Sequence, residues 1–206
     1  MTDLLTVHAT NQPDKLAVVD DRGSGAVRTL TYAELEQRSN QLAHVLLDHG
    51  VAAGDKLVWC GQNSVGIIEL VNAARKVDAT AVPLNYRSSD DEAAYVTDHS
   101  DAVLVYVDVA YAPLFDRIRS KIPSVRHVLV FDGDGLHDQI PADPLREAAS
   151  DDPVEPPSAE AAGATMIYTS GTTGKPKGAF RGDAGDPAYA LALIQFFGYQ
   201  PDDVYL

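Results

Sequence analysis

The sequence predicts an α/β fold, with a mostly parallel β-sheet and helices on both faces. Short apolar, β-branched segments alternate with helical segments between residues 15 and 131. Two S/T-x-x-E motifs mark the starts of helices within this alternation. Right-handed crossovers join strands that alternate with helices, and such crossovers make the sheet largely parallel. With 206 residues, of which 45% are hydrophobic, the chain can also build a substantial core.

The first elements are expected to be a β-hairpin and a long helix. Residues 15–20 and 26–31 are short and β-prone, and glycines lie between them, which is typical of a hairpin. Thr31 and Glu34 form a capping box, in which each side chain accepts a hydrogen bond from a backbone N–H group of the other residue. An apolar face follows, and Gly50 ends the predicted helix.

The same alternation continues to residue 131. Ser89 and Glu92 form the second capping box. Apolar runs and helical periodicity predict the following elements: strands at 56–60, 79–84, 102–107 and 125–131, and helices at 64–77, from the Ser89 cap to about His99, and at 110–121.

The alternation breaks at residues 132–163, where Asp, Gly and Pro accumulate, and we expect a linker-like connection with one short helix near 143–149. A strand is predicted at 165–169. Near the end of the sequence, Asp186 and Pro187 are expected to start a helix that ends at Gly198. Because this helix is apolar nearly all round, it is expected to be buried. The last residues, PDDVYL, read as a turn entering a further strand.

Composition excludes several classes of protein. The net charge is −14, so binding to a nucleic-acid backbone is not expected. Cys60 is the only cysteine, which rules out an internal disulfide and fits a reducing, cytoplasmic location. The N-terminus does not resemble a signal peptide, and no apolar run is long enough to predict a transmembrane segment.

The candidate site lies between Tyr168 and Gly178, in the sequence YTSGTTGKPKG. Its glycines allow the backbone to approach a ligand closely, its hydroxyl groups add donors, and its lysines add positive charge. These are the components of a triphosphate-binding loop. It is not a Walker A loop, because Gly171 and Gly174 are too close together and Pro176 follows Lys175. On composition alone, an ordinary solvated loop remains an alternative.

This string resembles the phosphate-binding signature of the adenylate-forming superfamily, which includes acyl-CoA synthetases, peptide-synthetase adenylation domains and beetle luciferases. Residues 72–85, NAARKVDATAVPLN, are similar to a second family segment, although Asp78 stands where that segment usually has glycine. The opening TYAELEQRSNQLAHVL is similar to the family's first long helix. The resemblance implies that the fold is part of the large N-terminal domain of an adenylate-forming enzyme.

The resemblance also implies a division of the chain and a role for the loop. Residues 1–206 are expected to be an incomplete N-terminal AMP-binding domain. It would comprise an α/β subdomain (1–131), the connection (132–163), and the loop with the start of the next subdomain (164–206). By position in the motif, the ATP phosphates would be bound by Thr169, Ser170, Gly171, Thr172, Thr173, Gly174 and Lys177.

The implied reaction has two steps. A carboxylate attacks the α-phosphate of ATP to give an acyl-adenylate and pyrophosphate, and a thiol, usually coenzyme A, then attacks the acyl carbon and releases AMP. Mg²⁺ would accompany ATP. The family's histidine motif, adenine-binding segment, ribose-binding Asp, metal-binding Glu and C-terminal Lys are absent from this sequence. No catalytic residue or metal ligand is therefore assigned, and coenzyme A would bind outside this chain.

The resulting hypothesis is an ATP-dependent acyl-CoA synthetase that activates a fatty or other apolar acid, present as an N-terminal fragment that is inactive alone. Phe180-Arg181-Gly182 is similar to fatty-acyl members of the family. One alternative is a noncatalytic remnant or interaction module that keeps the fold, and another is a peptide-synthetase adenylation domain. Surface exposed by truncation, including part of the 187–197 helix, is expected to favour self-association.

Overall fold

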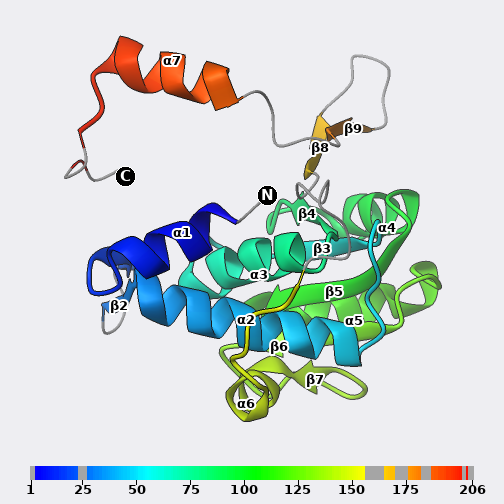
Figure 1. The fold of residues 1–206 in the computed structure, drawn as a ribbon. Helices are drawn as coiled ribbons and strands as arrows, with labels where there is room; N and C mark the ends of the chain where they lie inside the picture. Colours follow the sequence, from blue (N-terminus) through cyan, green and yellow to red (C-terminus); the bar gives the residue numbers. More distant parts are fainter. Residues whose placement is uncertain are drawn as a thin grey trace.

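The computed structural model describes residues 3–22, 27–155, 165–169, 176–181, 187–200 and 203. Within these residues, the chain forms a seven-stranded sheet and a separate two-stranded hairpin (Figure 1). The strand order in the large sheet is β7-β6-β5-β3-β4-β8-β9. All neighbouring strands are parallel except β8 and β9, which are antiparallel. The predicted mostly parallel α/β fold is confirmed.

The strands lie close to where the apolar runs predicted them. The strands predicted at 56–60 and 165–169 have the observed bounds. The strands predicted at 79–84, 102–107 and 125–131 differ from the observed ones by one or two residues at one end. The strands of the large sheet are β3 (Lys56–Cys60), β4 (Thr80–Leu84), β5 (Ala102–Asp108), β6 (His127–Phe131), β7 (Ile140–Pro141), β8 (Thr165–Thr169) and β9 (Lys177–Arg181). Only β7 and β9 were not predicted.

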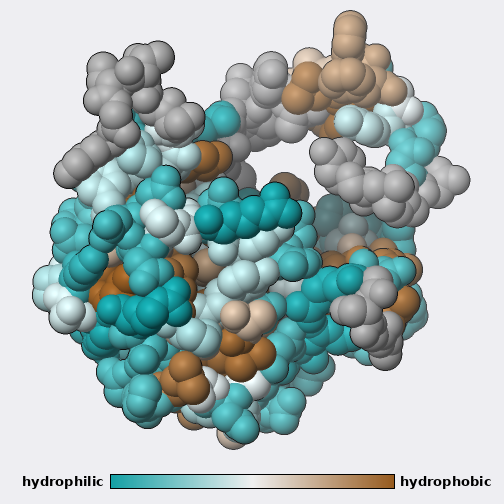
Figure 2. Space-filling view, turned by 180° about the vertical axis from the view of Figure 1, so that it is seen from behind, coloured by the Kyte–Doolittle hydropathy of each residue, from teal (hydrophilic) through white to brown (hydrophobic). Residues whose placement is uncertain are grey.

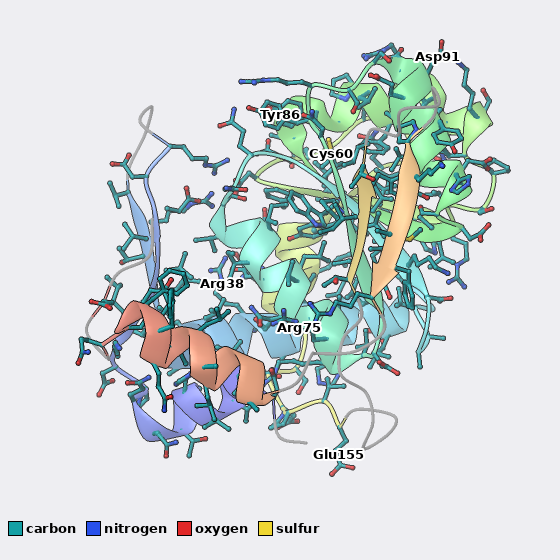
Figure 3. All side chains as sticks on the ribbon, turned by 90° about the horizontal axis from the view of Figure 1, so that it is seen from above. Arg38, Cys60, Arg75, Tyr86, Asp91 and Glu155 are labelled. Atoms are coloured by element: carbon teal, nitrogen blue, oxygen red, sulfur yellow. The ribbon has the colours of Figure 1, made fainter. Side chains whose placement is uncertain are left out.

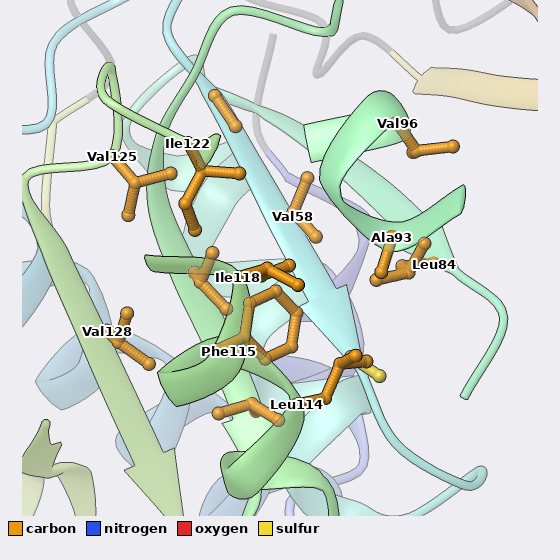
Figure 4. Close-up of a cluster of buried hydrophobic side chains, with 14 of the residues drawn as sticks. Val58, Leu84, Ala93, Val96, Leu114, Phe115, Ile118, Ile122, Val125 and Val128 are labelled. Carbon is orange, nitrogen blue, oxygen red and sulfur yellow. The ribbon is translucent and has the colours of Figure 1, made fainter. Parts of the chain in front are cut away.

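Helices cover both faces of the sheet. On one face, α2 (Tyr32–Asp48), α3 (Val65–Lys76) and α6 (Ala142–Ala148) enclose an apolar core with Leu42, Leu57 and Leu104. On the other, α4 (Asp90–His99) and α5 (Ala112–Ile118) pack over a second core that includes Val58 and Phe115 (Figure 4). Short 3₁₀ turns flank α5, at Val109–Tyr111 and Arg119–Lys121.

Both predicted capping boxes are present. The Thr31 hydroxyl accepts a hydrogen bond from the Glu34 N–H group, and the Glu34 carboxylate accepts one from the Thr31 N–H group. Ser89 and Glu92 make the same reciprocal pair at the start of α4. Helix α3 begins differently, because its N-cap residue Ser64 makes no side-chain capping bond.

The N-terminal segment forms its own small layer. β1 (Leu16–Asp20) and β2 (Arg28–Thr31) form the predicted antiparallel hairpin, and the turn at 23–26 lies outside the described residues. Helix α1 (Leu4–Asn11) was not predicted, because its apolar residues do not gather on one face: Leu5 is buried while Leu4 is 73% exposed. Leu5 packs with side chains from β2, α2 and α3.

A buried ionic cluster joins three helices on one face of the sheet. Glu69 of α3 is 1% exposed, and its carboxylate accepts a hydrogen bond from Arg38 of α2. Its second oxygen lies 3.6 Å from the guanidinium of Arg146 of α6, which also pairs with Asp143 at 3.1 Å. Burial raises the pKa of Glu69, and the charge of Arg38 opposes that rise. The segment expected to be linker-like therefore contributes α6 and an ion pair to the core, and α6 agrees with the short helix predicted near 143–149.

Helix α7 (Pro187–Phe197) lies apart from the rest of the molecule (Figure 1). The expectation that it is buried is wrong for the side chains that the structure describes. Phe196 is 82% exposed and Leu191 is 59% exposed, and Figure 2 shows an apolar surface over this helix. The expected N-cap Asp186 lies outside the described residues, as does the expected final strand apart from Asp203.

None of the described helices combines the length and the apolar character that crossing a lipid bilayer requires.

Candidate phosphate-binding site

The predicted loop connects β8 to β9 at one edge of the sheet. β8 is parallel to β4, so the loop starts at the edge where the carboxyl ends of β3, β4 and β8 meet. In open α/β sheets this edge is where ligands usually bind. Thr169 at the end of β8 lies opposite Lys177 at the start of β9, and both residues are exposed. Figure 3 shows the two strands side by side.

Two of the predicted phosphate-binding residues are thus brought together, and the others are not described. Thr169 and Lys177 form the last cross-strand pair of the β8–β9 ladder before the loop. The remaining predicted residues, and Lys175, lie outside the described part of the chain: Ser170, Gly171, Thr172, Thr173 and Gly174. The strand predicted at 165–169, directly before the loop, is confirmed, and the next described element along the chain is β9.

Gly178, the last residue of the motif, packs closely against the side chains of Met166 and Tyr168. It lies opposite Tyr168 on the paired strand. A Cβ atom at this position would collide with the Met166 Cε atom and would lie 3.1 Å from Cζ of Tyr168. The aromatic ring at the start of the motif and the glycine at its end therefore pack against each other.

Tyr168 also contacts helix α4. Its hydroxyl lies 2.8 Å from Nδ1 of His99, and burial raises the pKa of Tyr168 to about 12. The Tyr95 hydroxyl, one helical turn before His99, donates a hydrogen bond to the backbone oxygen of Pro176 at 3.2 Å. Sequence reasoning missed Tyr95 and His99, because nothing in the local sequence links them to a loop that lies some 70–80 residues further on.

A cavity of about 890 Å³ opens at the same edge of the sheet. Gly61, Gln62 and Asn63 line it after β3, and Asn85 and Tyr86 line it after β4. Ile167 and Tyr168 of β8 close its third side, directly before the loop. The cavity and the start of the loop therefore adjoin each other, and Figure 3 labels Tyr86 at this edge. This volume is within the range typical of small-molecule sites.

An ionic network covers the neighbouring part of this edge. The strand order reverses between β3 and β5, and there Arg22 pairs with Asp108 at 3.0 Å and with Asp132 at 2.7 Å. Arg28 also pairs with Asp132, at 2.8 Å. Although burial acts to raise it, these hydrogen bonds hold the pKa of Asp132 below its ordinary value. The network attaches the β1–β2 hairpin to the sheet. It also places the guanidinium of Arg22 where the strand order reverses, between β3 and β5.

Two further residues from the sequence analysis have clear structural roles. Cys60 is buried, and burial raises the pKa of its thiol to about 12, so the thiol stays protonated at neutral pH and is no nucleophile. Asp78 has a φ angle of 55°, which is the left-handed conformation that glycine favours. The turn between α3 and β4 therefore keeps the conformation that glycine would take.

The donor set of the described residues does not favour a resident metal ion. Within the described ranges, no group of three or more His, Cys, Asp or Glu side chains is arranged to hold one.

Comparison with known proteins agrees with the fold and the motif. The family model described as AMP-binding enzyme matches residues 5–206. The chain therefore belongs to the AMP-binding enzyme family. It is 35% identical over 179 residues to a long-chain-fatty-acid–CoA ligase of Mycobacterium tuberculosis, and 32% identical over 173 residues to a 3-oxocholest-4-en-26-oate–CoA ligase of Rhodococcus rhodochrous. These alignments cover 85% and 81% of this chain.

Solved structures give the same picture. A protein from Rhodopseudomonas palustris, assigned as a long-chain-fatty-acid CoA ligase, superimposes over 98% of this chain and 49% of its own, with a TM-score of 0.83 at 28% identity. The inhibitor-bound N-terminal domain of a Mycobacterium tuberculosis acyl-CoA ligase covers 86% of this chain and 42% of its own, with a TM-score of 0.73 at 30% identity. The chain spans about a third of the length of the curated relatives it matches.

Proposed function

We propose that this chain supplies the triphosphate-binding part of an ATP-dependent acyl-CoA synthetase. The observation that carries the proposal is the β8–β9 hairpin, which presents the motif at the carboxyl edge of the sheet with Thr169 and Lys177 at its base. Thr169, Ser170, Thr172 and Thr173 would donate hydroxyl hydrogen bonds to the β- and γ-phosphates, Gly171 and Gly174 would allow close backbone approach, and Lys177 would supply positive charge.

The proposed reaction activates a fatty or other apolar carboxylic acid. The carboxylate attacks the α-phosphate of ATP, forming an acyl-adenylate and releasing pyrophosphate, and the thiol of coenzyme A then takes the acyl group and releases AMP. Relatives named as ligases of long-chain fatty acids and of a steroid carboxylate favour this substrate class. Mg²⁺ would enter bound to the triphosphate and would screen its charge.

The role of this chain in that reaction is to hold the leaving group. Binding at the β- and γ-phosphates orients the α-phosphate toward the acid and stabilises the pyrophosphate as its charge develops. The residues that would bind adenine, ribose and coenzyme A are not assigned to this chain. We therefore expect the 206-residue chain to bind phosphate groups without catalysing turnover. A peptide-synthetase adenylation domain would pass the activated acid to a carrier protein instead of to coenzyme A. A noncatalytic module with the same fold would catalyse neither step of this reaction.

The proposal predicts that the 206-residue chain binds Mg·ATP and inorganic tripolyphosphate with dissociation constants on the order of 1 mM, and AMP much more weakly. The reason is that the proposed loop would contact the β- and γ-phosphates, which AMP lacks. Titration of the purified chain followed by ³¹P NMR measures all three affinities, and release of AMP with coenzyme A and a panel of fatty acids should stay at background. Equal affinity for AMP and ATP, or turnover near 1 s⁻¹, would contradict the proposal.

A further inference from the structure

We propose that Tyr95 and His99 of helix α4 are positioning residues that hold both ends of the phosphate-binding loop. Each side chain bonds to a residue next to one member of the Thr169–Lys177 pair at the base of the loop: Tyr168 lies on the strand side of Thr169, and Pro176 lies on the loop side of Lys177. The Tyr95 hydroxyl donates to the backbone oxygen of Pro176 at 3.2 Å, and Pro176 immediately precedes Lys177. Nδ1 of His99 lies 2.8 Å from the hydroxyl of Tyr168, which immediately precedes Thr169. We call Tyr95, His99 and Tyr168 the aromatic latch.

The rings of the aromatic latch contact one another in a row, from Tyr95 through His99 to Tyr168. Tyr95 and His99 are four residues apart and lie on one face of α4, with ring centroids 5.1 Å apart. The rings of His99 and Tyr168 meet edge-on, with centroids 5.8 Å apart and an interplanar angle of 83°. Tyr95 and Tyr168 also pack against the apolar core beneath α4. The latch therefore combines hydrogen bonds with ring packing, so that helix and hairpin are held at more than one point.

Helix α4 is a firm support for such contacts. A capping box closes its first turn, and Ala93, Ala94 and Val96 are buried against the sheet. Side chains on rigid elements hold functional geometry better than side chains on loops. The latch residues project from this supported helix toward the loop, so the loop's base takes its position from the core.

The hairpin needs this support because the sheet holds it mainly at the opposite end. β8 pairs with β4 where Ala81 lies opposite Thr165, which is the first residue of β8. The loop follows the last residue of β8, and β9 is the edge strand of the described sheet. The end that carries the loop is therefore fixed by its own ladder with β9 and by α4. Loss of the latch should let this end open first.

The inference rests on the proposed function in one respect, namely that the loop binds phosphate. Backbone N–H groups and hydroxyls grip an anion well only when their positions are set in advance. Fixing Tyr168 and Pro176 sets where the loop leaves and re-enters the sheet. The latch residues themselves would not touch the nucleotide, and they would act through the position of the loop.

The first test measures backbone hydrogen exchange of the 206-residue chain. Tyr95→Phe removes only the hydroxyl that reaches Pro176, and His99→Phe keeps a ring but loses the bond to Tyr168. We expect amides of β8 and β9 to exchange about 3- to 10-fold faster in each variant, because each loses one hydrogen bond that holds the hairpin. Amides of β5 and β6 should keep their wild-type rates.

Two controls make the result specific. His99→Asn restores a polar side-chain atom two bonds from Cβ, as in Nδ1 of histidine, and should return exchange in the hairpin toward the wild-type rate. Tyr111→Phe removes a hydroxyl that bonds to Gln62 outside the hairpin and should leave hairpin exchange unchanged. Unchanged rates in both Tyr95→Phe and His99→Phe, or an equal acceleration throughout the sheet, would overturn the positioning role.

The second test separates the latch from the phosphate proposal. Tyr95→Phe should weaken binding of inorganic tripolyphosphate several-fold while leaving the urea midpoint of unfolding nearly unchanged. If Lys177→Ala weakens tripolyphosphate binding but Tyr95→Phe and His99→Phe do not, the latch inference fails and the proposed function stands. If the wild-type chain and Lys177→Ala bind tripolyphosphate equally poorly while hairpin exchange still accelerates in the latch variants, the proposed function fails and the structural role of the latch stands.

Discussion

Replacing Lys177 by alanine should slow acyl-adenylate formation by on the order of 30- to 1000-fold, which is a loss of about 2–4 kcal/mol of transition-state stabilisation. Lys177 is exposed at the start of β9, opposite Thr169, and in the proposed function its ammonium group would contact a phosphate bound by the loop. Charge builds up on the β- and γ-phosphates as pyrophosphate leaves. A lysine at this position therefore contributes more to the transition state than to the bound ATP.

The measurement is ATP–pyrophosphate exchange in an active background. A chimera in which this chain replaces the matching third of the Mycobacterium tuberculosis long-chain-fatty-acid–CoA ligase would supply that background, since the two are 35% identical over 179 residues. Lys175→Ala in the same chimera is the matched control, because the family pattern leaves position 175 open, and it should have a much smaller effect. Equal and small effects of both substitutions would show that the Lys177 charge is only a solvated surface feature.

Glu69→Ala should destabilise the fold strongly, by about 3–5 kcal/mol of unfolding free energy. Glu69 is 1% exposed and Arg146 is 4% exposed, so alanine leaves a buried guanidinium paired with Asp143 at 3.1 Å and, more distantly, with Glu147 at 3.8 Å. Arg38 loses the same carboxylate. The cost arises because these charges have already been removed from water, and they cannot regain water without opening the contacts among α2, α3 and α6.

Urea unfolding followed by circular dichroism measures this loss. The control is Asp90→Ala, which breaks an ion pair with Arg117 at 2.8 Å in which the two side chains are about half exposed, at 43% and 54%. Exposed pairs contribute little, so this variant should unfold close to the wild-type midpoint. Comparable midpoints for Glu69→Ala and Asp90→Ala would mean that water already reaches the Glu69 cluster.

Most of the sheet could be predicted from sequence because its signals are local. β5 and β6 are continuous apolar runs, and the capping boxes at Thr31 and Ser89 lie within four residues of chain. β9 could not be predicted in this way. Its sequence, KGAFR, has a weak strand preference, and it becomes a strand because it pairs with β8 across the loop.

The same distinction between local sequence signals and long-range contacts applies to the candidate site. The motif identifies the loop and the residues that are expected to bind phosphate, because it is one contiguous string. The cavity beside it combines residues that follow β3 and β4 with residues of β8, and only the sheet order brings them together. The failed expectation for α7 has a related cause: an apolar composition predicts a preference for burial, but it does not say which surface will cover the helix.

The first turn of α3 is capped in a different way from those of α2 and α4. Helices α2 and α4 carry their own caps, so their first turns are satisfied by residues within one turn of chain. The N–H group of Val65 in α3 is bonded instead by the carboxylate of Asp20, 45 residues earlier, at 3.1 Å. That bond exists only once the β1–β2 hairpin has docked. The cap of α3 therefore depends on a contact between segments far apart in the sequence, whereas α2 and α4 are capped by residues within one turn of their own chain.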